Sequence, residues 1–546
     1  MKSGKRLVLF TLFVMNLVEQ PAPEVRIEQG KLSGKVSADG SFFEYLGIPY
    51  ASTNSSTRFQ APLSPPSWEG IYRAVDENYQ CPQPSFAGVI GTEDCLKINV
   101  YVPIKNQKQY PVMVYIHGGT YIIGNGGKLL YGPDFLVKKN VILVTFNYRL
   151  GALGFLCLGI KEAPGNAGLK DQIAALRWVK KNIAAFGGDP DNVTLFGLSA
   201  GATSVSMLIA SDATKGLFQR AILQSGVSTS SWALNRQPLF TASLVAKELG
   251  YETSDPKEMY NIFSKISYRD LVAAKPKKPI GKYFDFQLIH YPCIENVIEG
   301  EEAVLTDLPY NLFKKNSKNI SVIYGTTSKE GVILLPDETE DTLKERDSKY
   351  IFAPDLKFPT EDVAANLSSA VKQYYFGPKN ISFEDYNALL DLNTHLYFEV
   401  PSLLESEIVI NKTSAPIYHY YFNYSGGRNF LKYVAGYGNE PGACHGDEIM
   451  YLFNGQVWPF IVSKNDRKLI DWMTRMWTNF AKYGDPTPTA NDLPVRWNPS
   501  SKDNMTFLYI DAELKMGPIP NPDPYRLWKG IYNKYRKTNK VNDFRR

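Results

Sequence analysis

The chain has 546 residues, of which 44% are hydrophobic and 21% are charged, and its formal net charge is +5. This composition is typical of a folded protein with a large core, and it excludes both a disordered chain and a strongly basic chain selected for polyanions. No repeat, charge block or Ser/Gly-rich linker divides the sequence.

The first residues predict a targeting segment. A basic head, Met1 to Arg6, precedes an apolar run over residues 7–18 that stops at Glu19. This run is shorter than the ~20 apolar residues that span a bilayer, and it lies where a secretory signal does; a buried first helix is the alternative. We expect residues 1–20 to be a signal peptide and residues 21–546 to form a single domain of a secreted, extracellular protein.

Sequons and cysteines fit that compartment. Of five cysteines, the close pair Cys81 and Cys95 is the best disulfide candidate, and the odd number leaves at least one thiol free. Cys157, in the apolar segment GFLCLG, is expected to be a core thiol. The glycosylation candidates each begin Asn-x-Ser/Thr: Asn54, Asn319, Asn366, Asn380, Asn411, Asn423 and Asn504.

The next part of the chain alternates between strand and helix patterns. Residues 25–36 predict a small N-terminal antiparallel hairpin, and strands are predicted within residues 42–51, 98–103, 111–119 and 141–150. Residues 168–186 then predict a helix whose apolar face holds Leu169, Ile173, Leu176, Val179 and Ile183. This alternation predicts an α/β fold with a mostly parallel sheet and crossover helices.

The pattern GxSxG follows, as Gly197-Leu198-Ser199-Ala200-Gly201. The apolar run Val193 to Phe196 precedes it and an Ala-rich helix start follows it, which is the context in which this pattern exposes a serine on a sharp turn. A serine hydroxyl needs a base, an acid behind that base and donors for an oxyanion.

The donors are predicted in the segment that follows strand 111–116. Gly118 and Gly119 let backbone amides approach a reacting atom, so the amides of Gly118, Gly119 and Ala200 form the candidate oxyanion hole. A plain turn at the end of the strand is the alternative.

The base can nearly be found by elimination among five histidines. His117 belongs to the glycine loop, His290 has no acid clearly placed between it and Ser199, and His395 and His419 lie in helix-like and strand-like runs. His445 lies in the Gly-rich loop EPGACHGDE, where a loop-borne base is expected.

The acid cannot be chosen by spacing alone, because many Asp and Glu residues lie between Ser199 and His445. Glu330 has the best local setting, since it lies in the loop TTSKEG just after the strand-like ISVIYG, where α/β sheets place their active residues.

These segments together resemble the type-B carboxylesterases, α/β-hydrolases that include cholinesterases and the secreted insect carboxylesterases, which the chain resembles most. The resemblance is carried in order by FEYLGIPYA, TEDCLKINVYVP, VYIHGGT, NAGLKDQIAALRWVKKNIAAFGGDPDNVTLFGLSAG, GTTSKEG and GACHGDEIMYLF. It implies the α/β-hydrolase fold, with a large mostly parallel central sheet flanked by helices. It also implies Ser199 as nucleophile, Glu330 as acid, His445 as base, the three amides above as the oxyanion hole, and the Cys81–Cys95 disulfide.

The same resemblance implies three supporting residues. Ser225, in ILQSG, matches a serine placed near the acid, and Glu93 with Arg149 resembles a buried ion pair that braces the site.

We therefore expect a secreted serine carboxylesterase that hydrolyses small lipophilic esters, of odorant, pheromone, dietary or xenobiotic kind, through an acyl-enzyme and without a cofactor or a metal. In cholinesterases the loop closed by the first disulfide carries a tryptophan that holds the quaternary ammonium, whereas residues 82–94 contain none, so choline esters are disfavoured. Juvenile hormone esterases usually show GQSAG and GxxHxxD, whereas this chain has Leu198 in place of that glutamine and Glu448 in place of that aspartate. A juvenile hormone esterase-like hydrolase and a non-catalytic ligand-binding or adhesion relative are the alternatives.

Partners other than a small-molecule ester are not expected. A lipase acting at an oil or membrane surface needs an extended apolar lid, which the sequence does not show. The basic C-terminal run, residues 525–546, carries Leu527, Trp528, Ile531 and Tyr535 at helical spacing, so it predicts a docked last helix with a solvated tail and no nucleic-acid or stable membrane contact. The oligomeric state is left open.

Overall fold

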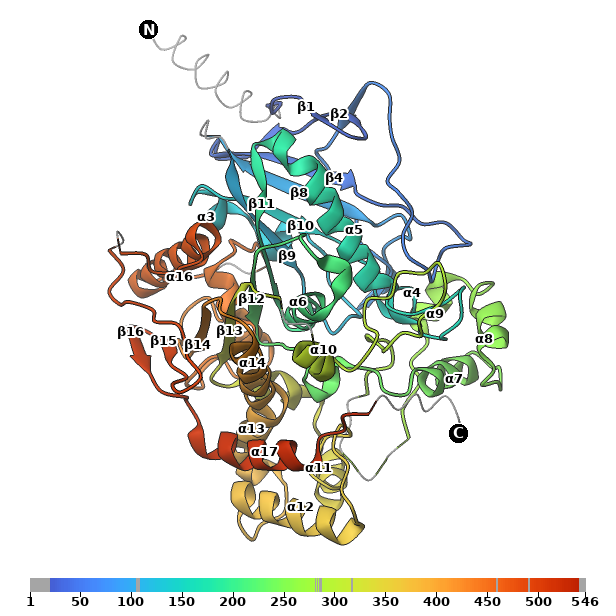
Figure 1. Cartoon of the computed structure of the whole chain (residues 1–546), viewed down its shortest axis with the longest axis vertical. Helices are drawn as coiled ribbons and strands as arrows, with labels where there is room; N and C mark the ends of the chain where they lie inside the picture. The colour runs from blue at the N-terminus through green and yellow to red at the C-terminus, as the bar shows by residue number, and fades with distance from the viewer. Residues whose placement is uncertain are drawn as a thin grey trace, which may run out of the picture.

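The computed structural model describes residues 20–104, 109–279, 281, 283, 287–315, 318–457, 460–489 and 492–539 (Figure 1). Residues 1–19 of the expected signal peptide and the last residues of the expected solvated tail lie outside this part of the chain, so both stay predictions.

A mixed sheet runs through the molecule. From β15 to β10 every neighbouring pair of strands is parallel, and the strands at both ends are antiparallel to their neighbours. Its strands, in spatial order, are β16 (Leu514–Gly517), β15 (Phe507–Ile510), β14 (Ile417–Phe422), β13 (Ser321–Thr327), β12 (Arg220–Gln224), β11 (Gly188–Leu198), β9 (Tyr110–Ile116), β10 (Ile142–Phe146), β8 (Lys97–Pro103), β4 (Phe42–Pro49) and β3 (Lys35–Val36).

The central strands are apolar because both of their faces are covered. All seven residues of β9 and all five of β10 are buried. Parallel strands buried on two faces have near-continuous hydrophobic sequences and lose the alternation seen in half-exposed strands. This explains why VMVYI and ILVTF could be recognised as strands without a period of two.

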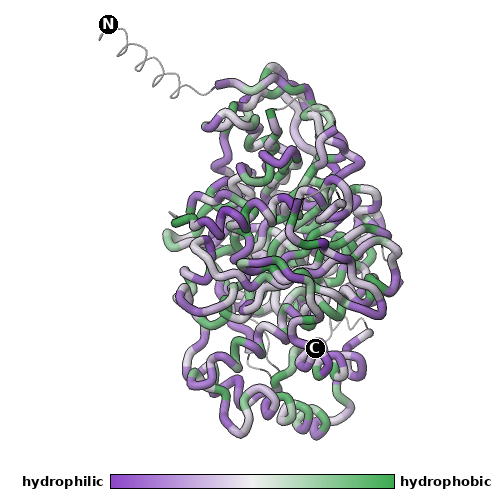
Figure 2. Tube along the Cα trace, turned by 90° about the vertical axis from the view of Figure 1, so that its left-hand side faces the viewer, coloured by the Kyte–Doolittle hydropathy of each residue, from purple (hydrophilic) through white to green (hydrophobic). Residues whose placement is uncertain are grey.

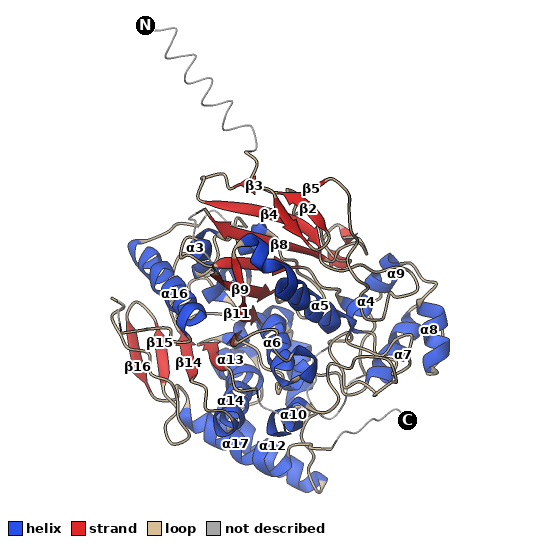
Figure 3. Ribbon diagram, turned by 45° about the horizontal axis from the view of Figure 1, so that its top comes forward, coloured by secondary structure: helices blue, strands red, loops and turns tan. Residues whose placement is uncertain are grey.

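Helices cover both faces of the sheet, as Figure 3 shows. One face packs on α5 (Ala167–Asn182), α6 (Ala200–Ala210), α10 (Pro309–Lys315) and α14 (Val400–Lys412). The other packs on α2 (Lys128–Tyr131), α3 (Asp134–Val137) and α16 (Lys464–Tyr483). The predicted apolar face of α5 is buried completely, which confirms its period.

Two further groups of helices build their own cores beside the sheet. The first contains α11 (Glu340–Ser348), α12 (Glu361–Phe376), α13 (Tyr386–Thr394), a π-helix η6 (His395–Glu399) and α17 (Pro522–Tyr535). The second contains α4 (Gly151–Phe155), α7 (Pro238–Glu248), α8 (Pro256–Phe263) and α9 (Tyr268–Ala273). The expected last helix is α17, in which Trp528 and Ile531 are buried.

Short elements complete the fold. The predicted N-terminal hairpin is β1 (Val25–Ile27) with β2 (Gly30–Ser33), and β5 (Ile71–Arg73) extends it. A second hairpin consists of β6 (Gln83–Ser85) and β7 (Gly88–Ile90). The remaining helical turns are α15 (Phe430–Val434) and the 3-10 segments η1 (Ile183–Phe186), η2 (Asp212–Thr214), η3 (Ser231–Ala233), η4 (Glu330–Asp337), η5 (Phe383–Asp385) and η7 (Asp447–Tyr451).

Apolar sequence is distributed through the whole body. In Figure 2 hydrophobic and hydrophilic stretches alternate along the trace. Within the described residues, none of the helices combines the length and the apolar character that a bilayer crossing requires.

Candidate active site

Ser199 occupies the sharp turn between β11 and α6. Its backbone has φ 58° and ψ −125°, a combination that strains an L-residue and persists only where the surroundings impose it. Its amide donates a hydrogen bond to the Gln224 carbonyl at 2.9 Å. The turn needs glycine after the serine, because a Cβ on Gly201 would lie 2.1 Å from the Ile116 carbonyl oxygen. Ser199 is partly exposed although all of α6 is buried, so the turn presents its side chain at an accessible position.

The glycine loop after β9 lies directly against this turn. A Cβ on Gly118 would lie 3.2 Å from the Ser199 Cβ, so only a glycine brings the backbone this close. Among the described residues, no hydrogen bond uses the amide of Gly118 or of Gly119. These amides, with that of Ala200 at the start of α6, remain available to an oxygen atom placed beside Ser199.

His117 supports the glycine loop from within the core. Its ring stacks on Tyr148 with the centroids 4.4 Å apart, and its Nδ1 lies 2.8 Å from the Gly118 carbonyl oxygen. Burial lowers the pKa of His117 to about 4, which leaves the ring neutral. This agrees with its assignment to the loop.

Glu330 and His445 form a buried hydrogen-bonded pair. His445 Nδ1 and Glu330 Oε2 lie 2.6 Å apart, and the two side chains are 3% and 0% exposed. The other carboxylate oxygen of Glu330 accepts a hydrogen bond from the Thr327 amide at 2.7 Å. The acid is therefore fixed to the end of β13, and it fixes the imidazole in turn.

The loops that carry the acid and the base are bonded to each other. The Lys329 amide donates to the Ala443 carbonyl at 2.8 Å, and the Ala443 amide donates to Ser328 Oγ at 2.9 Å. Asp447 closes the histidine turn by accepting a hydrogen bond from the Cys444 amide at 2.7 Å. The two bonds of Ala443 join segments more than 100 residues apart in the chain.

The histidine turn also packs on the serine turn. A Cβ on Gly446 would lie 2.9 Å from Leu198 Cδ2, and Leu198 immediately precedes Ser199. The candidate acid and base are thus in contact at the carboxyl ends of parallel strands, beside the turn that carries Ser199. Open α/β sheets place their ligands at this edge.

Aromatic rings line the site beside the histidine. The Phe398 ring lies 4.9 Å from the His445 ring, and Trp232 lies 5.9 Å from Phe398, measured between centroids. Trp232 is held by a hydrogen bond from its Nε1 to the Tyr397 carbonyl at 3.0 Å. Sequence reasoning missed this wall because it comes from two distant segments, neither of which has a motif.

Ser225 lies directly after β12, one strand away from β13. It has φ 56° and its amide donates to the Gly325 carbonyl at 2.9 Å. Its hydroxyl is buried and makes no hydrogen bond with the described residues. Ser225 is thus bonded to β13, the strand that Glu330 follows.

The expected ion pair between Glu93 and Arg149 is wrong. Arg149 pairs with Asp171 on α5, with Nη2 and Oδ1 2.6 Å apart, whereas Glu93 pairs with Arg58 at 2.8 Å. The reason is that Arg149 follows β10 and faces α5, while Glu93 lies outside this layer. The two pairs are nevertheless linked, since the Arg58 carbonyl accepts a hydrogen bond from Arg149 Nη1 at 3.0 Å.

The disulfide prediction is confirmed for Cys81 and Cys95. Cys157 is not a free core thiol, because it is bonded to Cys293, 136 residues away in the sequence. Cys444, next to His445, is the free and buried cysteine among the described residues. Burial raises the pKa of the Cys444 thiol well above its ordinary value, so it is an unreactive thiol.

Within the described part of the chain, no group of three or more His, Cys, Asp and Glu side chains is arranged to hold a metal ion. The chemistry available at this edge of the sheet is that of a serine hydroxyl, an imidazole–carboxylate pair and backbone amides.

This fold and the arrangement at its strand ends define an α/β-hydrolase. The sequence model described as "Carboxylesterase family" matches residues 21–528. The chain therefore belongs to the carboxylesterase family and is a carboxylic ester hydrolase.

Known proteins of this family are similar over most of their length. The chain is 34% identical to bile salt-activated lipase of Mus musculus, over 86% of this chain and 79% of the lipase. It is 32% identical to esterase FE4 of Myzus persicae, over 88% of both chains. The crystal structure of juvenile hormone esterase from Manduca sexta, with OTFP covalently attached, matches with a TM-score of 0.82 and 28% identity, over 94% of this chain and all of that one. The expected insect esterases are thus among the relatives, at an identity close to that of the mammalian lipase.

Proposed function

We propose that this esterase works through Ser199, His445 and Glu330. His445 takes the proton of the Ser199 hydroxyl as its oxygen attacks the ester carbonyl, and the amides of Gly118, Gly119 and Ala200 bind the oxyanion. His445 then gives the proton to the leaving alcohol. Water repeats the sequence on the acyl-enzyme and releases the acid.

One observation carries this proposal. The buried Glu330–His445 hydrogen bond of 2.6 Å fixes which ring nitrogen faces the acid, and the Gly446 turn packs on Leu198 next to Ser199. A carboxylate in this position holds the imidazole in the tautomer that accepts a proton on its other nitrogen, and it stabilises the imidazolium that forms.

The substrate class we propose is a small lipophilic ester, and the proposed location is extracellular. The rings of Phe398 and Trp232 beside His445 support an apolar substrate. The expected signal segment and the two disulfides support secretion. Likeness to a juvenile hormone esterase structure keeps a bulky hormone ester as the second candidate substrate.

The test is hydrolysis of p-nitrophenyl esters from acetate to long acyl chains by the purified protein, with Ser199→Ala as control. Turnover that disappears in the variant supports the serine mechanism, and the optimal chain length measures the acyl side of the pocket. A variant as active as the wild type would disprove the role of Ser199. A folded protein that turns over no member of the series, but hydrolyses juvenile hormone, would favour the second substrate. Inactivity on both would favour the non-catalytic relative.

A further inference from the structure

A π-helix lies directly behind the catalytic histidine. Residues His395–Glu399 form this turn between α13 and α14. Such turns are rare and are often found at functional sites, because the wider backbone loop re-aims the side chains that it carries. Two consecutive side chains of the turn make different contacts: Phe398 packs on the His445 ring, and Glu399 enters a cavity beside β13.

Glu399 is a buried carboxyl group, 2% exposed. Its Oε2 accepts a hydrogen bond from Asn521 Nδ2 at 2.8 Å and lies 3.9 Å from His395 Nε2. His395 does not supply a positive charge, since burial lowers its pKa to about 4. The carboxyl group of Glu399 therefore has a neutral amide and a neutral imidazole as its nearest polar partners.

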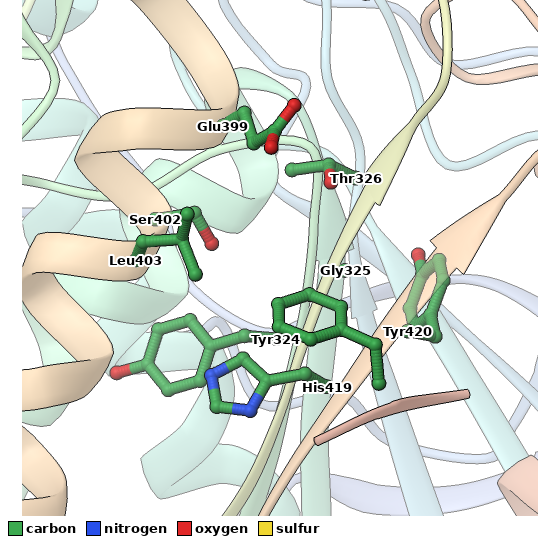
Figure 4. A pocket seen from close by; sticks show the side chains of 9 residues that line it. Tyr324, Gly325, Thr326, Glu399, Ser402, Leu403, His419 and Tyr420 are labelled. Atoms are coloured by element: carbon green, nitrogen blue, oxygen red, sulfur yellow. The ribbon is translucent and has the colours of Figure 1, made fainter. Parts of the chain in front are cut away.

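The cavity beside Glu399 reaches the strand that carries the acid. It is small, with a volume of about 10 Å³, and is lined by Thr326 at the end of β13, by Glu399 and Ser402, and by rings of β14 and β15. Figure 4 shows Glu399 entering from the helix and lying opposite Thr326. The next residue, Thr327, is the one whose amide holds Glu330.

Two acidic groups thus lie near the same end of β13. Burial raises the pKa of Glu399 to about 8, and the negative charge of Glu330 contributes to this rise. At neutral pH the carboxyl group of Glu399 is therefore protonated.

We propose that Glu399 is a positioning residue of the esterase, whose uncharged carboxyl keeps the π-helix and its Phe398 packed against His445. This inference rests on the proposed function, because it takes His445 as the base. When Glu399 loses its proton, a second buried negative charge faces Glu330 without a cation to balance it. The turn then has to open toward water, and the contact between Phe398 and His445 loosens.

No positive charge faces Glu399 directly from the described elements that pack on it. Lys329, whose charge acts on the neighbouring His395, is paired with Asp391 at 3.0 Å. The titratable and polar groups around Glu399, including those that line its cavity, are His395 of the π-helix, Asp391 of α13, Glu330 of η4, Tyr375 of α12, Thr326 of β13, Ser402 of α14, His419, Tyr420 and Tyr421 of β14, Tyr509 of β15 and Asn521 before α17.

The test compares pH profiles of kcat/KM for the wild type and Glu399→Gln, from pH 6 to 9.5, on one p-nitrophenyl ester. Glutamine keeps the acceptor for Asn521 and cannot ionise. With a pKa of about 8, only about one tenth of the Glu399 carboxyl stays protonated at pH 9. We expect the ratio of variant to wild-type kcat/KM to rise about tenfold between pH 7 and pH 9.

A second variant keeps the test decisive if Glu399→Gln folds poorly. The hydrogen bond from Asn521 favours the charged carboxyl, so Asn521→Ala moves the alkaline loss of wild-type activity to higher pH. If this bond is only structural, Asn521→Ala lowers activity at every pH and leaves the pH of the alkaline loss unchanged.

The matched control is Glu405→Gln. Glu405 is equally buried and lies on α14, but its partners are Ser206 and Ser228. The ratio of Glu405→Gln to wild-type kcat/KM stays constant with pH if the alkaline loss of activity comes from Glu399. The inference is overturned if kcat/KM falls in the same way above pH 7 in the wild type and Glu399→Gln. It is also overturned if Glu405→Gln shows the same rise relative to the wild type as Glu399→Gln. Equal activity of the wild type and Ser199→Ala would instead overturn the proposed function.

Discussion

Glu330 and His445 are 115 residues apart in the sequence and 2.6 Å apart in the structure, between Oε2 and Nδ1. Neither side chain is more than 3% exposed, so no solvent replaces this contact when one partner is removed. The contact is the strongest constraint on the chemistry of the site.

Glu330→Gln should abolish most of the activity while leaving the fold intact. The amide can present its NH₂ group to His445 and stabilise the wrong tautomer, and the analogous change in serine proteases costs about 10⁴ in rate. We expect a loss of kcat of that order with p-nitrophenyl acetate. The exposed Glu384→Gln is the control and should match the wild type. Full activity of Glu330→Gln would mean that another carboxylate serves His445.

Phe398→Leu should widen the apolar wall beside His445. The ring contacts both His445 and Trp232, so its replacement leaves room for a longer acyl or alcohol group. We expect kcat/KM for longer esters to rise about tenfold relative to acetate, the scale of one or two methylene contacts. Phe86→Leu, at the fully exposed tip of the β6–β7 hairpin, should leave the chain-length preference unchanged. An unchanged preference in Phe398→Leu would place the substrate elsewhere.

Two acid-to-amide variants should separate the two ion pairs. Asp171→Asn leaves the guanidinium of Arg149, which is 4% exposed, without a counter-charge, and breaking a buried pair in this way costs about 3–5 kcal/mol. Glu93→Gln affects a carboxylate that is 33% exposed, where a pair contributes at most about 1 kcal/mol. Urea unfolding of both variants measures the difference. Equal losses would mean that the four charges act as one network through the Arg58 carbonyl.

Local patterns predicted the central sheet and α5 well. The period of 3.6 in Leu169, Ile173 and Leu176 is a property of a single helix. The glycines on either side of Ser199 indicate the sharp backbone turn at that position. Such signals need no knowledge of distant contacts.

The errors concern pairs of residues that only the tertiary structure brings together. Asp171 lies outside the apolar face of α5, but the start of this helix is buried all round, so its carboxylate meets Arg149 inside the protein. Cys293 is 136 residues from Cys157, a separation that gives no sequence signal. The π-helix at His395–Glu399 was equally hidden, because its residues continue an ordinary helical pattern.

The seven sequons should differ in occupancy when the protein is expressed through a secretory pathway. Asn54, Asn366 and Asn380 are exposed, and we expect them to carry glycans. Asn423 and Asn411 use Nδ2, the atom that a glycan modifies, in hydrogen bonds to Asp511 and to the Glu407 carbonyl at 2.7 and 2.8 Å. Peptide mass spectrometry after enzymatic deglycosylation in ¹⁸O water measures each site. High occupancy at Asn423 would contradict this ranking.

Stability should depend on pH through Glu405. Burial raises the pKa of this carboxyl from 4.5 to about 7, although Ser206 and Ser228 donate hydrogen bonds to it. The folded state therefore holds a proton that the unfolded state releases above about pH 4.5. The stabilisation is complete below that pH and is lost as the pH rises through 7.

The unfolding free energy of the wild type, relative to Glu405→Gln, should fall by about 3 kcal/mol between pH 4.5 and pH 8. Glutamine does not titrate, so the difference between the two proteins isolates Glu405 from other buried carboxyl groups whose pKa values burial also raises, such as Glu399, Glu448 and Asp447. Urea unfolding at closely spaced pH values measures it. A difference that stays constant with pH would mean that the two serine hydroxyls stabilise the carboxylate enough to keep its pKa near the ordinary value.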